Sequence, residues 1–319
     1  TMLTFEGLGL GTRSLGPVFA LVSQVIATQR ALARFATPAQ QDRWLRPLVH
    51  GRALGAFAMT EPRAGSATAS ITTVAEADGD GFRLTGTKAW ATLGPECDVL
   101  VVFAATDPDA GRWGQTAFVV DTSAAGVTLQ AATPKFGLHG CPVGEIGLDE
   151  VAVDVGNILG RIGAGASVFS YAVDAERAFM YGSQLGATER LLADAIDWTR
   201  AHRVGDAPLG GHQAVSHRVV DMHLRHQSAR MLLFRAALLH DRGAPVAEAA
   251  ALAKLAISEG AVESALDMIR ILGARGYGTD HSAGTDLLDA LGGWFYSGTS
   301  DIARNVVASS LRLERPRRR

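Results

Sequence analysis

The sequence predicts a multidomain protein of α and β parts in series: a short N-terminal helical region, a middle β-barrel or β-sandwich domain, and a C-terminal four-helix bundle. Three patterns predict this order. Residues 1–50 have helical apolar spacing, residues 51–160 contain short alternating runs separated by Gly, Pro and Asp, and residues 161–319 return to long segments with helical spacing. We therefore place the domain boundaries near residues 50 and 160.

The composition excludes several classes of protein. The formal net charge is −2, so no excess of basic residues indicates nucleic-acid binding. No apolar run approaches the roughly 20 residues that a membrane span needs. Cys97 and Cys141 form neither a disulfide framework nor a metal-ligand cluster, so we expect no metal site and a cytoplasmic setting.

The N-terminal region reads as helix in two stretches. Leu15–Ala33 is apolar almost all round, as a buried helix is. Thr37 is a good N-cap for a second helix, because Pro38 follows in the first turn and Gln40 stands three residues on, where it can complete a capping box.

The middle domain opens with a predicted hairpin. Thr72–Ala77 alternates as a strand does, Asp78–Gly81 forms a turn, and Phe82–Leu84 resumes before a second turn at Thr85–Thr87. Later strands are expected at Asp98–Ala105, Thr116–Val120, Val127–Gln130, Gly147–Leu148 and Val151–Val153. The glycine-rich stretch Gly160–Gly165 marks the hinge into the third part.

Helical spacing dominates the rest of the chain. The predicted helices are Val168–His202, Gln213–Arg242, Val246–Leu272 and a shorter one from Leu291 to about Leu313, interrupted at Gly298. Their short connections imply antiparallel neighbours, hence a four-helix bundle. Residues 315–319 read as a solvated basic tail.

Two patterns in the middle domain suit a ligand. In the loop Met59–Ser66, Pro and Gly end an apolar approach and leave small residues, backbone amides and hydroxyls, which suit an anionic or carbonyl-rich group. In Lys88–Thr92 a Trp stands two residues before a hydroxyl, which suits an aromatic ring system. The alternative is that the same residues bind no ligand and form only a turn and a Trp packed in the core.

In this order, the two patterns resemble the middle domain of the acyl-CoA dehydrogenase family, which has a TEP-x-A-G-S loop followed by G-T-K-x-W-x-T. The resemblance implies an FAD-dependent oxidoreductase that desaturates an acyl thioester between its α and β carbons. It implies that the flavin ring and pyrophosphate are contacted by Met59, Thr60, Gly65 and Ser66, and that the ring is flanked near N5 by Trp90 and Thr92. We call Thr60–Ser66 together with Trp90–Thr92 the flavin bed.

The resemblance leaves the general base in an unusual place. The family's commonest base is a Glu in a Y-E-G-T stretch, but here the stretch is Tyr296–Thr299 and Ser297 replaces the Glu. Ser297 has no activating partner next to it in the sequence. The isovaleryl- and long-chain acyl-CoA enzymes instead carry the Glu in an L-x-x-E-R pattern on the first bundle helix. Val173–Arg177 matches this pattern, which implies that Glu176 removes the α-proton and that Arg177 orients Glu176. Without the family resemblance, Glu176 would be interpreted as an ordinary surface Glu paired with a neighbouring Arg.

Other family positions match less evenly. The resemblance implies further cofactor contacts from Arg203, Gln213, Arg270, Gly273 and Thr299, the first two across a subunit interface. Arg270 stands where the family usually has Gln, so its cation could contact a phosphate instead. Leu288 replaces the Arg of an Arg-Asp pair that Asp289 completes. Family members usually carry several more helices before this point, so we expect either a truncated chain or a naturally reduced N-terminal domain.

The Tyr-Ser-Gly-Thr-Ser stretch with Glu-Arg on the first bundle helix resembles the family branch associated with polyketide and nonribosomal-peptide biosynthesis, that is, secondary metabolism. The resemblance implies an acyl thioester of CoA or of an acyl or peptidyl carrier protein as substrate, a homodimer or homotetramer, and no nucleic-acid or membrane partner. Arg218, Arg225 and Arg230 could attract an acidic carrier protein, although a solvated helix face explains them equally well. Two alternatives stay open: a flavin-dependent monooxygenase, and a non-catalytic partner subunit of an active homologue.

Overall fold

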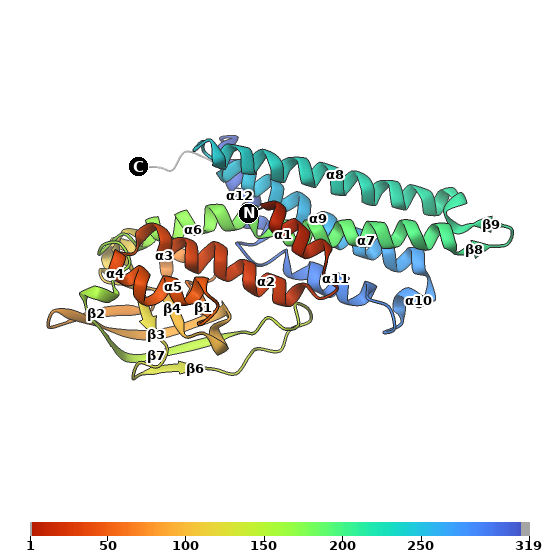
Figure 1. Ribbon diagram of the computed structural model, residues 1–319. Helices are drawn as coiled ribbons and strands as arrows, with labels where there is room; N and C mark the ends of the chain where they lie inside the picture. The colour runs from red at the N-terminus through yellow and green to blue at the C-terminus, as the bar shows by residue number, and fades with distance from the viewer. Residues whose placement is uncertain (1, 314–319) are drawn as a thin grey trace. The chain divides into compact units, whose positions relative to one another are not determined.

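The computed structural model describes residues 2–313, so Thr1 and the predicted basic tail lie outside the described residues. Contacts divide the chain into two compact units. We call one the helical unit: residues up to Phe19, Phe136–His139, and the chain from Arg177 on. The other, the sheet unit, comprises Ala20–Lys135 and Gly140–Glu176. Figure 1 labels their helices and strands.

The predicted N-terminal helices are confirmed. They are α1 (Met2–Leu10), then α2 (Leu15–Ser23), π-helical η1 (Gln24–Gln29) and α3 (Arg30–Phe35), and then α4 (Pro38–Gln40), π-helical η2 (Gln41–Leu45) and α5 (Arg46–Val49). The capping box at Thr37 is present: its hydroxyl accepts from the Gln40 amide at 3.3 Å, and the Gln40 side chain accepts from the Thr37 amide at 2.8 Å. Gln40 also donates 2.8 Å hydrogen bonds to the carbonyls of Gly156 and Ile158, which fasten this helix to the sheet unit.

One helix is long and apolar enough to cross a membrane by length and composition alone. Leu15–Phe35 is 21 residues long with a mean hydropathy of 1.2. Polar residues such as Gln24 and Thr28 interrupt this segment, so it is not one unbroken apolar run. In the structure 61% of the window is buried in protein, as in the core helix of a globular protein.

A single sheet of seven strands forms the centre of the sheet unit. Its strands are β1 (Gly55–Ala58), β2 (Val74–Asp78), β3 (Gly81–Thr92), β4 (Val99–Ala105), β5 (Gln115–Asp121), β6 (Val127–Leu129) and β7 (Val143–Val153). The strand order is β1-β4-β2-β3-β7-β6, with β5 antiparallel to β4. Short 3₁₀ turns connect them: η3 (Thr68–Ser70), η4 (Gly94–Glu96), η5 (Pro108–Gly114) and η6 (Val155–Asn157).

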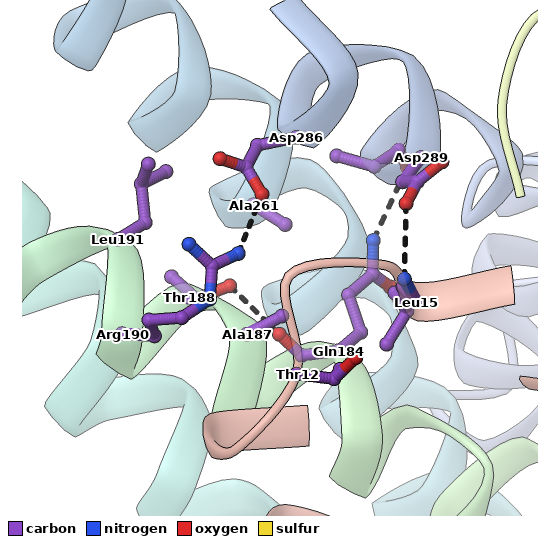
Figure 2. Close-up of a pocket in the computed structure, with 11 residues that line it drawn as sticks. Thr12, Leu15, Gln184, Ala187, Thr188, Arg190, Leu191, Ala261, Asp286 and Asp289 are labelled. Atoms are coloured by element: carbon purple, nitrogen blue, oxygen red, sulfur yellow. Dashed lines mark hydrogen bonds and ion pairs between the residues drawn. The ribbon is translucent and has the colours of Figure 1, made fainter. Parts of the chain in front are cut away.

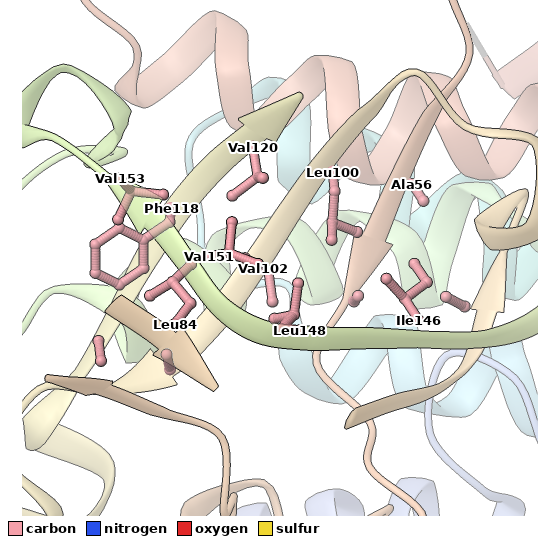
Figure 3. Close-up of a cluster of buried hydrophobic side chains, with 14 of the residues drawn as sticks. Ala56, Leu84, Leu100, Val102, Phe118, Val120, Ile146, Leu148, Val151 and Val153 are labelled. Atoms are coloured by element: carbon pink, nitrogen blue, oxygen red, sulfur yellow. The ribbon is translucent and has the colours of Figure 1, made fainter. Parts of the chain in front are cut away.

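Strand β4 is buried on both faces, which explains its uninterrupted apolar sequence. Leu100 and Val102 point into a core made by the strands themselves, which Figure 3 shows with Phe118 of β5 and Ile146 of β7. The alternate residues Val99, Val101 and Phe103 pack against the helices of the same unit, through Leu32, Trp44, Leu48 and Val168. The period of two thus gives the sheet two cores.

The predicted hairpin is confirmed at its first turn and wrong at its second. Strands β2 and β3 pair from Val74↔Thr85 to Asp78↔Gly81. Instead of turning at Thr85–Thr87, β3 runs on to Thr92 with a register shift beside Gly86. A Cβ at Gly86 would lie 2.5 Å from the Thr73 hydroxyl, so the glycine allows a close approach there. A bulge of this kind looks like a turn in the sequence.

The helical unit is built on three long helices that lie side by side in Figure 1: α7 (Tyr181–Ala201), α8 (Gln213–Asp241) and α9 (Ala247–Leu272). The hairpin β8 (Arg203–Val204) and β9 (Ala207–Pro208) with the 3₁₀ turn η7 (Leu209–Gly211) connects α7 to α8. The helix α6 (Gly165–Phe179) precedes α7 across Met180. Helix α1 packs closely on α7 because a Cβ at Gly186 would lie 1.9 Å from the Glu6 carbonyl oxygen.

The predicted last helix is two helices. After α10 (Ala274–Tyr277), α11 (Ala283–Gly292) and α12 (Ser300–Ser310) both pack on α9. The prediction that a helix starts at Leu291 was wrong because residues 293–299 form turns, with positive φ angles of 55° at Ser297 and 87° at Gly298. The interruption predicted at Gly298 is therefore wider than one residue.

Candidate active site

The loop Met59–Ser66 is a tight turn that presents its small residues. Glu61 and Ala64 exchange backbone hydrogen bonds of 3.1 Å, so the chain reverses over Pro62 and Arg63. Gly65 and Ser66 are exposed, and a Cβ at Gly65 would meet nothing within 4 Å. Met59 is different: its side chain is buried in the core between sheet and helices, so only its backbone could face a ligand in this conformation.

Strand β3 brings Trp90 beside this loop. The amide of Ala89 donates to the carbonyl of Thr60 at 2.8 Å, which joins the loop to the residue before Trp90. Trp90 has a φ of 55°, a conformation that is unfavourable for an aromatic residue, and the register of β3 against β7 shifts around it. Its side chain is 63% exposed, whereas Thr92 is half-buried. A strained backbone that turns a large ring outward is typical of a ligand site.

A buried ion pair under the flavin bed was missed in the sequence. The Lys88 ammonium lies 2.8 Å from the Glu61 carboxylate, and both side chains are almost inaccessible to solvent. The two oxygens of Glu61 also accept from the amides and hydroxyls of Thr72 and Thr73, at 2.5 to 2.9 Å. A period-two reading from Leu84 would have put Lys88 on a buried face, which was the available signal.

The electrostatics of the pair reflect its burial. Burial raises the pKa of Glu61, but the hydrogen bonds from Lys88 and Thr73 outweigh it and hold the pKa at about 2. Burial lowers the pKa of Lys88 to about 8, against the opposing attraction of Glu61. Both groups are therefore charged near neutral pH.

The turn Tyr296–Ser300 is fixed by the surrounding helices. Arg177 Nε donates to the Ser297 carbonyl at 3.3 Å, and the Tyr181 hydroxyl donates to the Tyr296 carbonyl at 3.1 Å. The rings of Tyr181 and Tyr296 stack with centroids 4.9 Å apart. Thr299 caps α12 by accepting from the Ile302 amide at 3.2 Å. These contacts hold the backbone at Ser297, the position where the resemblance leads us to expect a Glu.

A second buried cation holds this turn from α9. Lys254 Nζ lies 3.0 Å from the Ser300 hydroxyl and 3.5 Å from the Trp294 carbonyl. It also lies 5.9 Å from the centre of the Tyr181 ring, within the range of a cation–π contact. Burial lowers the pKa of Lys254 to about 8. No local pattern in the sequence indicates a role for Lys254 or Tyr181, because their contacts join helices that are far apart in sequence.

The remaining predicted residues are spread over the chain. Glu176 is half-buried on α6, one residue before Arg177. Arg203 is exposed on the β8–β9 hairpin, and Gln213 is exposed at the first turn of α8. Gly273, with a φ of 61°, ends α9. These placements leave the predicted cofactor contacts as predictions.

Four arginines of α8 and α9 are engaged in ion pairs. Asp267, nearly buried, lies 3.0 Å from Arg218, 2.5 Å from Arg225 and 3.2 Å from Arg270. Arg230 is paired with Glu6 at 2.6 Å. Arg270 is thus already bound to a carboxylate, and a phosphate would share it with Asp267. The arginines considered for a carrier protein likewise have carboxylate partners.

A narrow hollow in the helical unit lies elsewhere. Figure 2 shows Arg190 of α7 and Asp286 of α11 in contact at 2.5 Å across it, beside Gln184. At its other end, Asp289 accepts from the amide of Leu15 at 3.3 Å, as Figure 2 shows. It also accepts from the amide of Leu138 at 2.5 Å. Asp289 thus has backbone amides as partners, at a position where the resemblance implies an arginine partner. The ion pair lines the hollow, and we assign no ligand to it.

Two family models match this sequence. Residues 56–151 match the acyl-CoA dehydrogenase middle domain, and residues 163–312 match the acyl-CoA dehydrogenase C-terminal domain. The chain belongs to the acyl-CoA dehydrogenase family. The resemblance drawn from the TEP and GTK motifs is confirmed, and so is the fold class.

Relatives of this acyl-CoA dehydrogenase family member cover almost all of it. An L-prolyl-[peptidyl-carrier protein] dehydrogenase from Pseudomonas fluorescens is 38% identical over 314 residues, which are 98% of this chain and 83% of the relative. The short-chain specific acyl-CoA dehydrogenase of Homo sapiens mitochondria is 33% identical over 309 residues, 97% of this chain and 74% of the relative. The chain therefore aligns with enzymes of both substrate types.

Solved structures agree with this placement. The prolyl acyl carrier protein oxidase AnaB has a TM-score of 0.95 at 35% identity, and PigA with FAD and proline has a TM-score of 0.96 at 32% identity. In both comparisons the match covers 98% of this chain and 82% of the other. Butyryl-CoA dehydrogenase from Megasphaera elsdenii has a TM-score of 0.94 at 30% identity. The match covers 98% of this chain and 81% of the Megasphaera enzyme.

Proposed function

We propose that this protein is an FAD-dependent dehydrogenase that desaturates an acyl thioester between its α and β carbons. The observation that carries the proposal is the pair of family motifs folded into one surface: the exposed loop Gly65–Ser66 beside an exposed Trp90 with a positive φ. This surface fits a flavin, because the indole offers a flat face and the loop offers small residues and a hydroxyl. Met59 would contribute through its backbone, and Thr60 and Thr92 would complete the bed.

FAD, when bound, supplies the two-electron acceptor that takes the β-hydrogen as hydride. The chain's own task is proton removal: the Glu176 carboxylate takes the α-proton, and the electrons of the broken α C–H bond form the new double bond. Arg177, the residue after Glu176, holds the Ser297 turn through its hydrogen bond to the Ser297 carbonyl. The Ser297 hydroxyl donates to the Met180 sulfur at 3.3 Å, and we assign the base to Glu176 and not to Ser297.

We infer that the acyl group is carried by a peptidyl carrier protein and that a prolyl thioester is the first substrate to test. Support comes from relatives named for the prolyl-carrier reaction at 38% and 33% identity. A CoA thioester is the second candidate, since the short-chain acyl-CoA enzymes align over a similar length. The Tyr-Ser-Gly-Thr-Ser stretch supports the first choice, and with it a role in secondary metabolism.

We further propose a homodimer or homotetramer in the cytoplasm. Arg203 and Gln213 are exposed, as residues that reach a cofactor in a neighbouring subunit would be in the isolated chain. Arg270, Gly273 and Thr299 stay candidates for the same cofactor. The two cysteines are buried free thiols, which suits a reducing compartment.

Flavin reduction by substrate tests the proposal. The purified protein should take up FAD, and the flavin absorbance should bleach anaerobically on adding a prolyl-carrier or acyl-CoA thioester. Glu176→Gln should abolish bleaching without releasing FAD, whereas the matched control Asp174→Asn on the same helix should keep it. Oxygen-dependent product formation that survives Glu176→Gln would favour the monooxygenase. A colourless protein that takes up no FAD would favour the non-catalytic subunit.

A further inference from the structure

We propose that the buried Glu61–Lys88 ion pair sets the geometry of the flavin bed and acts as a positioning pair for the cofactor. This inference rests on the proposed function, since the bed is useful only if a flavin occupies it. Neither residue lies on the exposed surface that would meet a ligand: Glu61 is 3% and Lys88 is 0% exposed. Their effect would pass through the residues that they hold.

The pair connects the two halves of the bed. Glu61 is inside the loop Thr60–Ser66, and Lys88 is two residues before Trp90 on β3. The ammonium reaches the Glu61 carboxylate at 2.8 Å and the Met59 carbonyl at 3.4 Å, so it bonds to the loop on both sides of Thr60. The backbone bond from Ala89 to Thr60, 2.8 Å, closes the same link. A change in the pair would therefore move the loop relative to Trp90.

Glu61 also anchors the loop to a third segment. It accepts four hydrogen bonds, two each from Thr72 and Thr73, the residues that lead into β2. The Thr73 carbonyl in turn accepts from Ala105 at the end of β4 at 2.8 Å, so the anchor reaches the centre of the sheet. All polar atoms of the carboxylate are engaged, which makes the arrangement rigid.

The stability of the sheet alone does not explain the buried Glu61–Lys88 ion pair. A buried ion pair is weak evidence for stability, since an apolar pair of similar volume often serves as well. Here the pair lies at the point where β3 departs from regular pairing and Trp90 takes a strained φ of 55°. Such strain persists only when the surroundings over-determine the backbone. The ion pair and its threonines supply that constraint.

Lys88→Met and Glu61→Gln test the inference against a core variant, Leu84→Ala. Leu84 lies on the same strand and is fully buried in the core between the strands, as Figure 3 shows. Its apolar side chain makes no hydrogen bond to the loop or to Trp90. Titration of the apoprotein with FAD, followed by flavin fluorescence, should give dissociation constants about tenfold higher for the two pair variants than for the wild type. Leu84→Ala should lower the melting temperature about as much as the two pair variants do, yet bind FAD with the wild-type affinity. Equal affinity losses at equal loss of melting temperature would overturn the inference.

A milder variant and a second readout keep the test decisive if the pair variants fold poorly. Thr72→Val removes one hydroxyl donor to Glu61 and should weaken FAD binding by a few-fold, about 2 to 5. In the apoprotein, hydrogen exchange of the amides of Thr72, Thr73 and Ala89 should accelerate in these variants, while the amides of β4 and β5 stay protected. Unchanged exchange at those three amides would refute the inference without any cofactor. Failure of the wild type itself to bind FAD would instead refute the proposed function.

Discussion

Arg177 Nε donates a hydrogen bond of 3.3 Å to the carbonyl oxygen of Ser297. Arg177 directly follows Glu176, the proposed base, and Ser297 occupies the turn where most of the family carries the base. Ser297 has a φ of 55°, which a non-glycine residue rarely adopts. The residue next to the proposed base therefore holds the turn that has lost its carboxylate.

Arg177→Met should lower kcat by about tenfold while the fold persists, because a hydrogen bond from a charged donor to a partly buried acceptor is lost. The kcat of Arg177→Lys should lie between those of the wild type and Arg177→Met, since Lys keeps the charge without the planar guanidinium. Steady-state kinetics with the thioester that bleaches the flavin would measure this. Arg304→Met is the matched control, because the exposed Arg304 of α12 forms surface ion pairs with Asp301 on α12 and Glu259 on α9. A loss of kcat as large in Arg304→Met would contradict the assignment.

Local patterns predicted the elements that local forces determine. The Thr37 capping box and the Asp78–Gly81 turn depend on neighbours within a few residues, and both are present. The turn expected at Thr85–Thr87 failed because Gly86 serves a contact with Thr73 from another segment. The same limit applies to the site. Motif spacing found Trp90 and the loop, but pairing Glu61 with Lys88 requires knowing how the loop crosses β3.

Trp90→Ala should weaken FAD binding with little change in melting temperature, because the indole is 63% exposed and contributes little to the core. Loss of an aromatic stacking partner should raise the dissociation constant by about three- to tenfold. Trp113→Ala is a close control, since Trp113 is 65% exposed in the same unit, on η5. Fluorescence titration with FAD checks both. Equal affinity of Trp90→Ala and the wild type would remove Trp90 from the bed.

The Glu61 carboxylate predicts a loss of stability in acid. Its pKa is about 2 when folded and 4.5 in its ordinary state, so the unfolded chain binds the proton first as the pH falls. The stability that Glu61 contributes is present above pH 4.5 and is lost as the pH falls toward 2. The unfolding free energy of the wild type should therefore fall more steeply between these values than that of Glu61→Gln. Urea unfolding at several pH values measures this, and Glu76→Gln, at an exposed position of β2, should behave like the wild type.

Lys254 predicts a gain of stability in alkali. Burial lowers its pKa from 10.5 to about 8, so between these values the unfolded chain holds a proton that the folded chain has lost. The contribution of Lys254 to the unfolding free energy should therefore rise as the pH goes from 8 to 10.5. Lys88, whose pKa is also about 8, contributes a rise over the same range. In urea unfolding the rise should therefore be smaller in Lys254→Met than in the wild type, whereas Lys135→Met should keep it in full.

The same variant separates stability from positioning. Replacing a buried charge with an apolar side chain of similar length often leaves a protein as stable or more so. Lys254→Met should nevertheless lower kcat, because the Ser300 hydroxyl and the Trp294 carbonyl lose the donor that fixes the turn around Ser297. Lys254→Arg retains a donor and should recover part of the activity if the enlarged side chain is accommodated. A stable Lys254→Met enzyme with wild-type kcat would show that the turn needs no fixing from α9.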